Sequence, residues 1–237
     1  MIQTGTACDP LLKRPFSIYN FEQNHLSFLY RIRGKGTLSL SQLREGDVLQ
    51  VIGPLGNSYP EPDGDFIAVA GGIGIASLLP LIRKYRQRAY LFYGAMNTGD
   101  LVMLEETREL AKEIFITTDD GSDGQKGWIT HAVKDFLGEL KIANQPSPRR
   151  KGALSIYACG PVPMLKALSE ITRAAGLPCY ASMEEHMACG IGACLGCVVK
   201  IADKRASLQR GAEAAGQFIY KRVCKEGPIF NIEDIVW

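Results

Sequence analysis

Four cysteines near the C-terminus have the spacing to bind an iron–sulfur cluster. Cys189, Cys194 and Cys197 form a C-x4-C-x2-C run, and Cys224 follows after 26 intervening residues. This is the plant-type spacing for the thiolate ligands of a 2Fe–2S centre. The glycines inside the run let the backbone wrap closely and turn its amides toward the sulfides. The pattern therefore predicts that these four cysteines bind two irons and two sulfides.

Two other interpretations of these cysteines remain open, a structural zinc site and free buried thiols. Zinc sites usually pair two C-x2-C knuckles, and only one occurs here. Thiols without a metal would have no packing reason to gather in one run. An odd total of 7 cysteines favours metal binding over a disulfide framework. Cys8, Cys159 and Cys179 are then expected to lie outside the cluster.

A glycine-rich turn forms the second candidate site. Residues 68–77 (AVAGGIGIAS) predict a strand, a turn and the start of a helix. Backbone amides and the helix dipole at such a position can hold a pyrophosphate. The turn departs from the G-x-G-x-x-G fingerprint, and no acidic residue follows about 20 residues later, so a classical Rossmann dehydrogenase is disfavoured. A turn that binds no ligand remains an alternative.

Two further segments carry weaker chemical signals. Residues 14–17 (RPFS) and 34–37 (GKGT) offer a guanidinium for a phosphate and small hydroxyls for a flavin edge. Residues 159–161 (CGP) follow a predicted parallel strand, at the edge where open α/β sheets bind ligands. The alternative for residues 14–17 is an Arg-Pro at the surface that binds nothing. The alternative for Cys159 is an inert buried thiol.

The elements that must position these residues change character near residue 62. Before it, alternating apolar and polar residues at 26–33 and 47–52 predict antiparallel strands. A joint rich in proline and glycine follows at 59–65. Beyond it, apolar runs at 66–70, 89–93, 114–118 and 154–158 alternate with predicted helices at 77–88, 100–112, 130–140 and 161–175. This rhythm indicates βαβ units and a parallel sheet, with domains at 1–62, 63–178 and 179–237.

Composition excludes several classes of function. The 237 residues are 46% hydrophobic and 22% charged, which is ordinary for a folded domain, and the net charge of +2 provides no basic field for nucleic acid. The longest uncharged stretch, 66–82, is too short and too rich in glycine to cross a membrane. No secretory signal opens the chain, which predicts a cytoplasmic protein. Three scattered histidines and no nucleophile motif give hydrolysis little support.

The motifs taken in order resemble a known family. RPFS, GKGT, VAGGIGIA, TDDGS, YACGP, ACGIGACLGC and VCKEGPIF together resemble the ferredoxin-reductase-like electron-transfer subunit of class B dihydroorotate dehydrogenase, over nearly the whole chain. The resemblance implies a flavin-binding β-barrel, an NAD-binding α/β domain with a parallel sheet, and a small C-terminal 2Fe–2S domain. The cysteine run is the most specific of these motifs.

The resemblance also implies which residues bind the cofactors. FAD would be held by Arg14, Pro15, Phe16, Ser17, Leu29, Tyr30, Arg31, Gly36 and Thr37. NAD would be held by Gly71, Gly72, Gly74 and Ala76, with Cys159, Gly160 and Pro161 near the nicotinamide and flavin rings. The cluster would be held by Cys189, Cys194, Cys197 and Cys224. No residue of the chain is assigned a catalytic role.

The implied function is electron transfer in pyrimidine biosynthesis. A nicotinamide exchanges two electrons, a 2Fe–2S centre exchanges one and a flavin does both, so NAD, FAD and cluster form a chemically sensible series. By the resemblance, the cluster connects to a catalytic partner subunit that contains FMN and oxidises dihydroorotate, in a heterotetramer with two copies of each subunit. The chain alone is then expected to show no activity on dihydroorotate, because it offers no base for removing a carbon-bound proton.

Other functions are compatible with the same motifs, and the sequence departs from the family pattern in two places. The chain could instead be the reductase subunit of a ferredoxin–NADP transhydrogenase, sulfite reductase or hydrogenase, or a flavin-less iron–sulfur carrier or sensor. The basic stretch 83–88 hints at NADP. Residues 204–216 lengthen the spacing before Cys224 and suggest an inserted loop. Because the family's barrel begins before Met1, we expect an upstream start codon and weak FAD binding by the chain as given.

Overall fold

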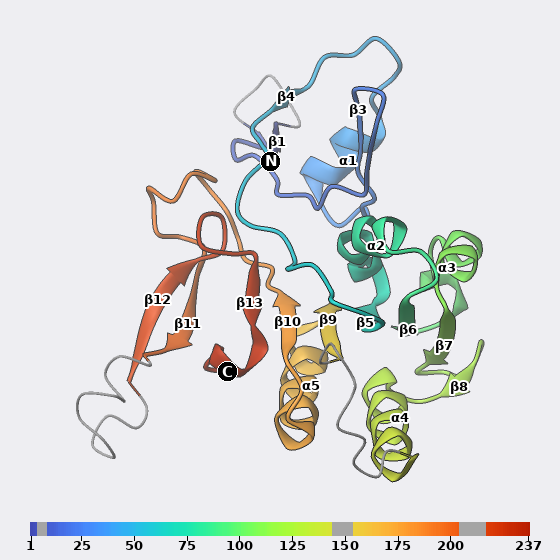
Figure 1. Cartoon of the computed structure of the whole chain (residues 1–237). Coiled ribbons are helices and arrows are strands. Elements are labelled where there is room, and N and C mark those ends of the chain that lie inside the picture. The colour runs from blue at the N-terminus through green and yellow to red at the C-terminus, as the bar shows by residue number, and fades with distance from the viewer. Residues whose placement is uncertain (4–8, 144–153, 204–216) are drawn as a thin grey trace. The chain divides into compact units, whose positions relative to one another are not determined.

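The computed structural model describes residues 1–3, 9–143, 154–203 and 217–237, which form two compact units (Figure 1). The terminal unit comprises Met1–Ser17, Tyr30–Ser58 and Met183–Trp237, and the central unit comprises Ile18–Leu29 and Tyr59–Ser182. Cys8, the loop expected at 144–152 and the insertion expected at 204–216 lie outside the described residues. The division into three domains stays a prediction.

A parallel sheet forms the centre of the central unit, as predicted. Its strands run in the order β10-β9-β5-β6-β7-β8, and every neighbouring pair is parallel. The four predicted strands are β5 (Phe66–Gly71), β6 (Ala89–Ala95), β7 (Glu113–Thr118) and β9 (Ser155–Cys159). Two short strands, β8 (Gln125–Lys126) and β10 (Cys179–Ser182), were not predicted.

Helices cover both faces of this sheet (Figure 1). The helices α2 (Ile75–Lys84) and α3 (Leu104–Leu110) lie on one face, and α4 (Ile129–Ala143) and α5 (Val162–Ala175) lie on the other. Residues 66–70 of β5 are all fully buried, so this strand is apolar on both sides, as the central strand of a parallel sheet must be. Gly176, in the left-handed conformation, ends α5.

The order of the strands creates a ligand-binding position between β5 and β9. The chain builds outward from β5 through β6, β7 and β8, and then returns to the other side of β5 with β9 and β10. Open α/β sheets bind ligands at the carboxyl ends of the strands where this direction reverses. The short helix η1 (Gly72–Gly74) and residues 159–161 lie at this point.

A hairpin from the N-terminal part of the chain belongs to the central unit. Its strands are β2 (Asn20–Glu22) and β3 (His25–Ser27). The Arg83 guanidinium lies 4.3 Å from the ring centre of Tyr19, just before β2, and donates to Glu106 Oε1 at 2.6 Å. The prediction of a strand over 26–33 is wrong beyond Ser27, where the pairing of β3 with β2 ends. Leu26 and Ile32 are both exposed.

The terminal unit contains short antiparallel pairs. Among the residues described there, β1 (Ile2–Gln3) pairs with β4 (Gln50–Val51), β11 (Val198–Ala202) pairs with β12 (Phe218–Arg222), and no closed barrel is present. The helix α1 (Lys35–Ser41), the strand β13 (Ile229–Asn231) and the short helix η4 (Ile232–Asp234) complete it. In both units, the described helices are all too short or too polar to span a membrane.

Candidate functional site

The structure brings the two predicted nucleotide-binding segments together at the carboxyl edge of the sheet. A Cβ atom on Gly71 would lie 2.6 Å from Pro161 Cδ and 3.2 Å from Gly160 Cα, and one on Gly74 would collide with the carbonyl oxygen of Cys159. Close packing therefore requires glycine at positions 71 and 74. Gly72 differs, because it has a φ of 52° and open space around it. Its conformational freedom allows the tight turn at the start of α2, a position where backbone amides can bind a phosphate.

Tyr59 links these segments, although the sequence did not single it out. Its ring packs edge-on against Tyr157 with centroids 5.6 Å apart, and its hydroxyl donates to the Ala158 carbonyl at 3.1 Å. The same hydroxyl lies 3.4 Å from Ser77 Oγ, which donates to the Gly74 carbonyl at 3.2 Å. Burial raises the pKa of Tyr59 well above its usual range, so the phenol stays protonated. The glycine turn and the end of β9 are thus joined through one hydroxyl.

We expect Tyr59→Phe to lower the free energy of unfolding by about 1–3 kcal/mol, because the buried Ala158 carbonyl loses its donor. Urea denaturation of the unmutated and variant chains would measure the change. Tyr220→Phe is the matched control, since Tyr220 is 60% exposed, and we expect it to change stability by less than about 0.5 kcal/mol. Equal effects of the two substitutions would contradict the role given to Tyr59.

The basic stretch 83–88 does not reach this edge, which removes the hint of NADP drawn from it. The carbonyl of Arg88 accepts a hydrogen bond at 3.0 Å from Phe66, the first residue of β5, so the stretch lies at the amino ends of the strands. Arg83 is engaged by Glu106, and Lys84 by Glu61. Arg88 donates to the Gly64 carbonyl at 2.6 Å.

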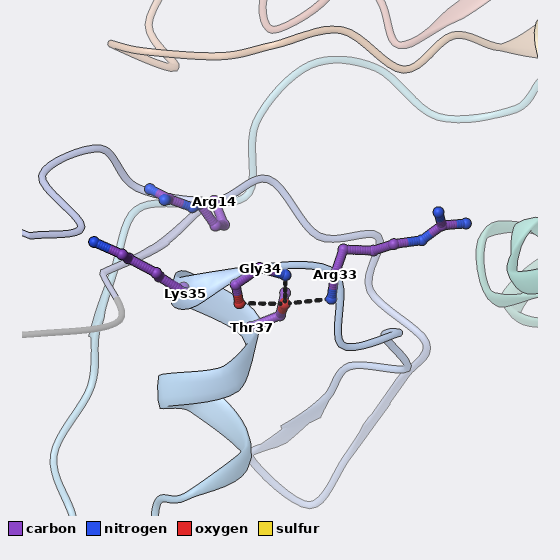
Figure 2. Close-up of a pocket in the computed structure, with 6 residues that line it drawn as sticks. Arg14, Arg33, Gly34, Lys35 and Thr37 are labelled. Carbon is purple, nitrogen blue, oxygen red and sulfur yellow. Dashed lines mark hydrogen bonds between the residues drawn. The ribbon is translucent and has the colours of Figure 1, made fainter.

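Three of the predicted FAD residues, Arg14, Gly36 and Thr37, line a small basic pocket in the terminal unit. It has a volume of ≈ 220 Å³ and is lined by Arg14, Arg33, Gly34, Lys35, Gly36 and Thr37. Figure 2 shows Arg14 and Lys35 extending to the same side, whereas the side chain of Arg33 points the opposite way. Lys35 Nζ is ion-paired with Asp9 Oδ2 at 2.7 Å and Arg14 Nη1 donates to the Leu12 carbonyl, so a phosphate-bearing ligand would compete with these partners for the two cations.

Thr37 holds the loop that forms this pocket. Its hydroxyl accepts from the backbone N–H groups of Arg33 at 2.9 Å and Gly34 at 3.2 Å, and donates to the Gly34 carbonyl at 3.1 Å (Figure 2). The predicted residues Pro15, Ser17 and Arg31 are in the same unit but do not line the pocket, and Phe16 and Tyr30 pack with ring centres 5.6 Å apart. Leu29 belongs to the central unit. Gly34 and Lys35 lie in the GKGT segment named from the sequence but were not assigned to FAD, and Arg33 was not singled out.

The four predicted cluster cysteines fall into two pairs. Cys189 accepts a hydrogen bond on Sγ from the Cys194 amide at 3.4 Å, and its thiol also contacts the Cys194 thiol. Cys197 and Cys224 are buried and hydrogen-bonded to each other through their thiols. Nowhere in the described residues do three metal-binding side chains converge on one point. A two-iron cluster takes two thiolates on each iron, and the two pairs have this number of thiols.

The backbone around the cysteines is shaped to face sulfur. Gly190 and Gly192 have φ values of 72° and 82°, and the Gly196 amide donates to Cys194 Sγ at 3.4 Å. Amide hydrogen bonds lower the pKa of Cys189 to about 6, which favours the thiolate that binds metal. Burial, followed by the hydrogen bond with Cys197, raises the pKa of Cys224 to about 11 in the absence of metal.

Two family models match the chain at these places. The oxidoreductase NAD-binding domain matches residues 68–170, and the iron–sulfur cluster binding domain of dihydroorotate dehydrogenase B matches residues 184–236. The sheet, its glycine turn and the paired cysteines therefore define an oxidoreductase of the iron–sulfur electron-transfer class.

Curated relatives narrow this class. The dihydroorotate dehydrogenase B (NAD(+)) electron transfer subunit of Caldanaerobacter subterraneus subsp. tengcongensis is 42% identical over 95% of this chain and 81% of its own length. The subunit of the same name from Geobacillus kaustophilus is 35% identical over 99% of this chain and 84% of its own. The chain belongs to the family of electron transfer subunits of dihydroorotate dehydrogenase B.

A solved structure has the same fold over most of the chain. It is the NADH-dependent reduced ferredoxin-NADP oxidoreductase studied for flavin-based electron bifurcation, with a TM-score of 0.73 and 28% identity. The similarity covers 95% of this chain and 75% of that one. It extends through both the N-terminal and the cysteine-bearing parts of the sequence.

Proposed function

We propose that this protein carries electrons between NAD and a partner dihydroorotate dehydrogenase subunit that contains FMN. The observation that carries the proposal is the identity of 42% with an electron transfer subunit of that enzyme across 95% of the chain. The two cysteine pairs support it, because they suit a two-iron cluster. A bound FAD would convert the paired electrons of a hydride into the single electrons that such a cluster accepts.

In this proposal each predicted segment binds one group. The paired cysteines 189, 194, 197 and 224 bind the 2Fe–2S cluster, and the turn at 71–76 with residues 159–161 binds the dinucleotide. The basic pocket beside α1 binds the phosphates of FAD. The pairing of β1 with β4 and the bridge between Ile2 and Arg14 are antiparallel, as the strands of the proposed flavin domain would be. A heterotetramer with two copies of each subunit, and a cytoplasm that keeps the cysteines reduced, complete the proposal.

A second function is favoured by the solved structure alone. The likeness to the NADH-dependent reduced ferredoxin-NADP oxidoreductase suits a subunit that passes electrons toward ferredoxin or NADP. Its identity of 28% is lower than the 42% of the dihydroorotate relative. The basic stretch 83–88, at the amino ends of the strands, adds nothing in favour of NADP.

Reconstitution with the partner tests the proposal. We expect the purified chain to oxidise no dihydroorotate, and its complex with the FMN-containing catalytic subunit of the same organism to reduce NAD with dihydroorotate. Absorbance at the NADH band would follow the reaction, and the catalytic subunit alone is the control. Dihydroorotate oxidation by the isolated chain, or a complex that reduces ferredoxin or NADP but not NAD, would contradict the proposal.

A further inference from the structure

The two segments that supply the cysteines are tied to each other at only one end by the β-ladder. In the pairing of β11 with β12, Val198 lies opposite Arg222, and the Val223 amide donates to the Cys197 carbonyl at 2.7 Å. These bonds fix Cys197 beside Cys224. Residues 189–196 form bends and no strand, so the ladder does not set the distance between this loop and Cys224.

Arg222 connects the cysteine loop to the segment that carries Cys224. Its Nη1 donates to the Gly192 carbonyl at 2.8 Å, and this carbonyl lies in the middle of the cysteine loop. Gly192 adopts a φ of 82°, and a Cβ there would lie 2.8 Å from Lys225 Cδ and 3.4 Å from Arg222 Nη1. The loop therefore packs closely against the turn that carries Cys224. Two polar contacts join them, the hydrogen bond of the guanidinium to the Gly192 carbonyl and the hydrogen bond of the Gly192 amide to the Cys224 thiol.

Glu226 holds the guanidinium in this orientation. Its Oε2 accepts from Arg222 Nε at 2.9 Å and from the Arg222 backbone N–H at 2.7 Å, while Oε1 pairs with Nη2. The Glu226 amide donates back to the Arg222 carbonyl at 2.9 Å. The two residues flank Cys224 in sequence, so a closed ring of bonds surrounds the turn that presents this thiol. A two-pronged guanidinium–carboxylate pair fixes geometry in a way that a lysine cannot.

We propose that Arg222, oriented by Glu226, is a positioning residue for the iron–sulfur cluster: it holds the loop of Cys189 and Cys194 at the distance from Cys197 and Cys224 that one two-iron cluster requires. It acts through the Gly192 carbonyl, and its positive charge also interacts electrostatically with the Cys224 and Cys197 thiols. The inference rests on the cluster of the proposed function and not on the identity of the partner subunit.

Cluster retention in Arg222→Gln and Arg222→Lys tests this role. Outer-shell partners of metal sites typically contribute 10–100-fold to affinity, so we expect both variants to lose iron to a chelator about tenfold faster than the unmutated chain. Lysine should not rescue the loss, because one ammonium cannot serve both Glu226 and the Gly192 carbonyl. Glu226→Gln, which keeps hydrogen bonding but loses the charge, should show a smaller acceleration. Iron and sulfide content and the electron paramagnetic resonance of the reduced, anaerobic protein are the readouts.

Two controls distinguish a positioning role of Arg222 from the loss of its positive charge and from a loss of stability of the whole chain. Lys221→Gln removes a positive charge one residue away and should leave iron loss unchanged. NADH binding reports on the central unit and should not change in any of these variants. An Arg222→Gln chain that keeps its cluster as long as the unmutated chain would overturn the inference, and so would one that loses NADH binding together with iron. If the unmutated chain holds its cluster but its complex fails to reduce NAD, the proposed function fails and the role of Arg222 stands.

Discussion

Replacing Cys224 by serine is expected to abolish the 2Fe–2S signal of this protein. Cys224 is 4% exposed and is paired with Cys197, so its removal leaves one iron with a single protein thiolate. The loss should exceed the roughly 10–100-fold that outer-shell changes cost at metal sites. Iron and sulfide analysis with electron paramagnetic resonance of the reduced, anaerobically purified chain would measure it.

Cys179→Ala is the control for this substitution. Cys179 is fully buried in β10 within the central unit, where alanine leaves a small cavity and a hydroxyl would need a new partner. We expect its cluster signal to equal that of the unmutated chain. A cluster that survives in Cys224→Ser would refute the assignment of Cys224. One zinc and no sulfide in the unmutated chain would instead support the zinc interpretation.

The α/β part of the fold could be predicted because its signal is local. Strands inside a parallel sheet are rich in apolar residues, and β5, β6, β7 and β9 each contain a run of at least three. β10 was missed because Cys179–Ser182 is short and half of its residues are cysteine and serine. It becomes a strand through pairing with β9, which no local pattern records.

The N-terminal part was predicted less well for a physical reason. Alternation at 26–33 suggested a strand, but the apolar positions Leu26 and Ile32 are exposed, so no buried face extends the strand beyond Ser27. The helix α1 was not predicted, because its sequence KGTLSLS contains a glycine and two serines, which are poor or middling helix formers.

The residues of the candidate site also include some that the sequence could predict and others that it could not. Three of the four cysteines lie within one short segment, whose spacing could be recognised from the sequence. Tyr59 contacts Ala158, 99 residues away, and Arg222 contacts Gly192, 30 residues away, so neither role could be inferred before the chain was folded. The sequence also lacked an indication that Gly71 and Gly74 are needed for packing as well as for any ligand.

Gly74→Ala is expected to weaken NADH binding by about tenfold or more. The added Cβ would collide with the Cys159 carbonyl oxygen and lie 2.7 Å from its carbon, and both are backbone atoms that cannot rotate away. Overpacking of this kind costs about 1–3 kcal/mol, and 1.4 kcal/mol corresponds to a factor of ten in affinity. The turn must then move away from the end of β9, at the edge where the dinucleotide is proposed to bind. Titration with NADH, followed by fluorescence, would measure the affinity.

Gly138→Ala separates this collision from the effect of alanine itself. Gly74 has a φ of −58°, so alanine is not strained there and, at the start of α2, does not oppose the helix. Gly138 lies in α4 with nothing within 4 Å of its would-be Cβ, so alanine there should stabilise the protein by about 0.5–1 kcal/mol and leave NADH affinity unchanged. If Gly74→Ala also bound NADH normally, the close approach of the turn to β9 would be irrelevant to the nucleotide, and the proposed site at this edge would be wrong. A loss of affinity confined to Gly74→Ala would locate dinucleotide binding at the meeting of these two segments.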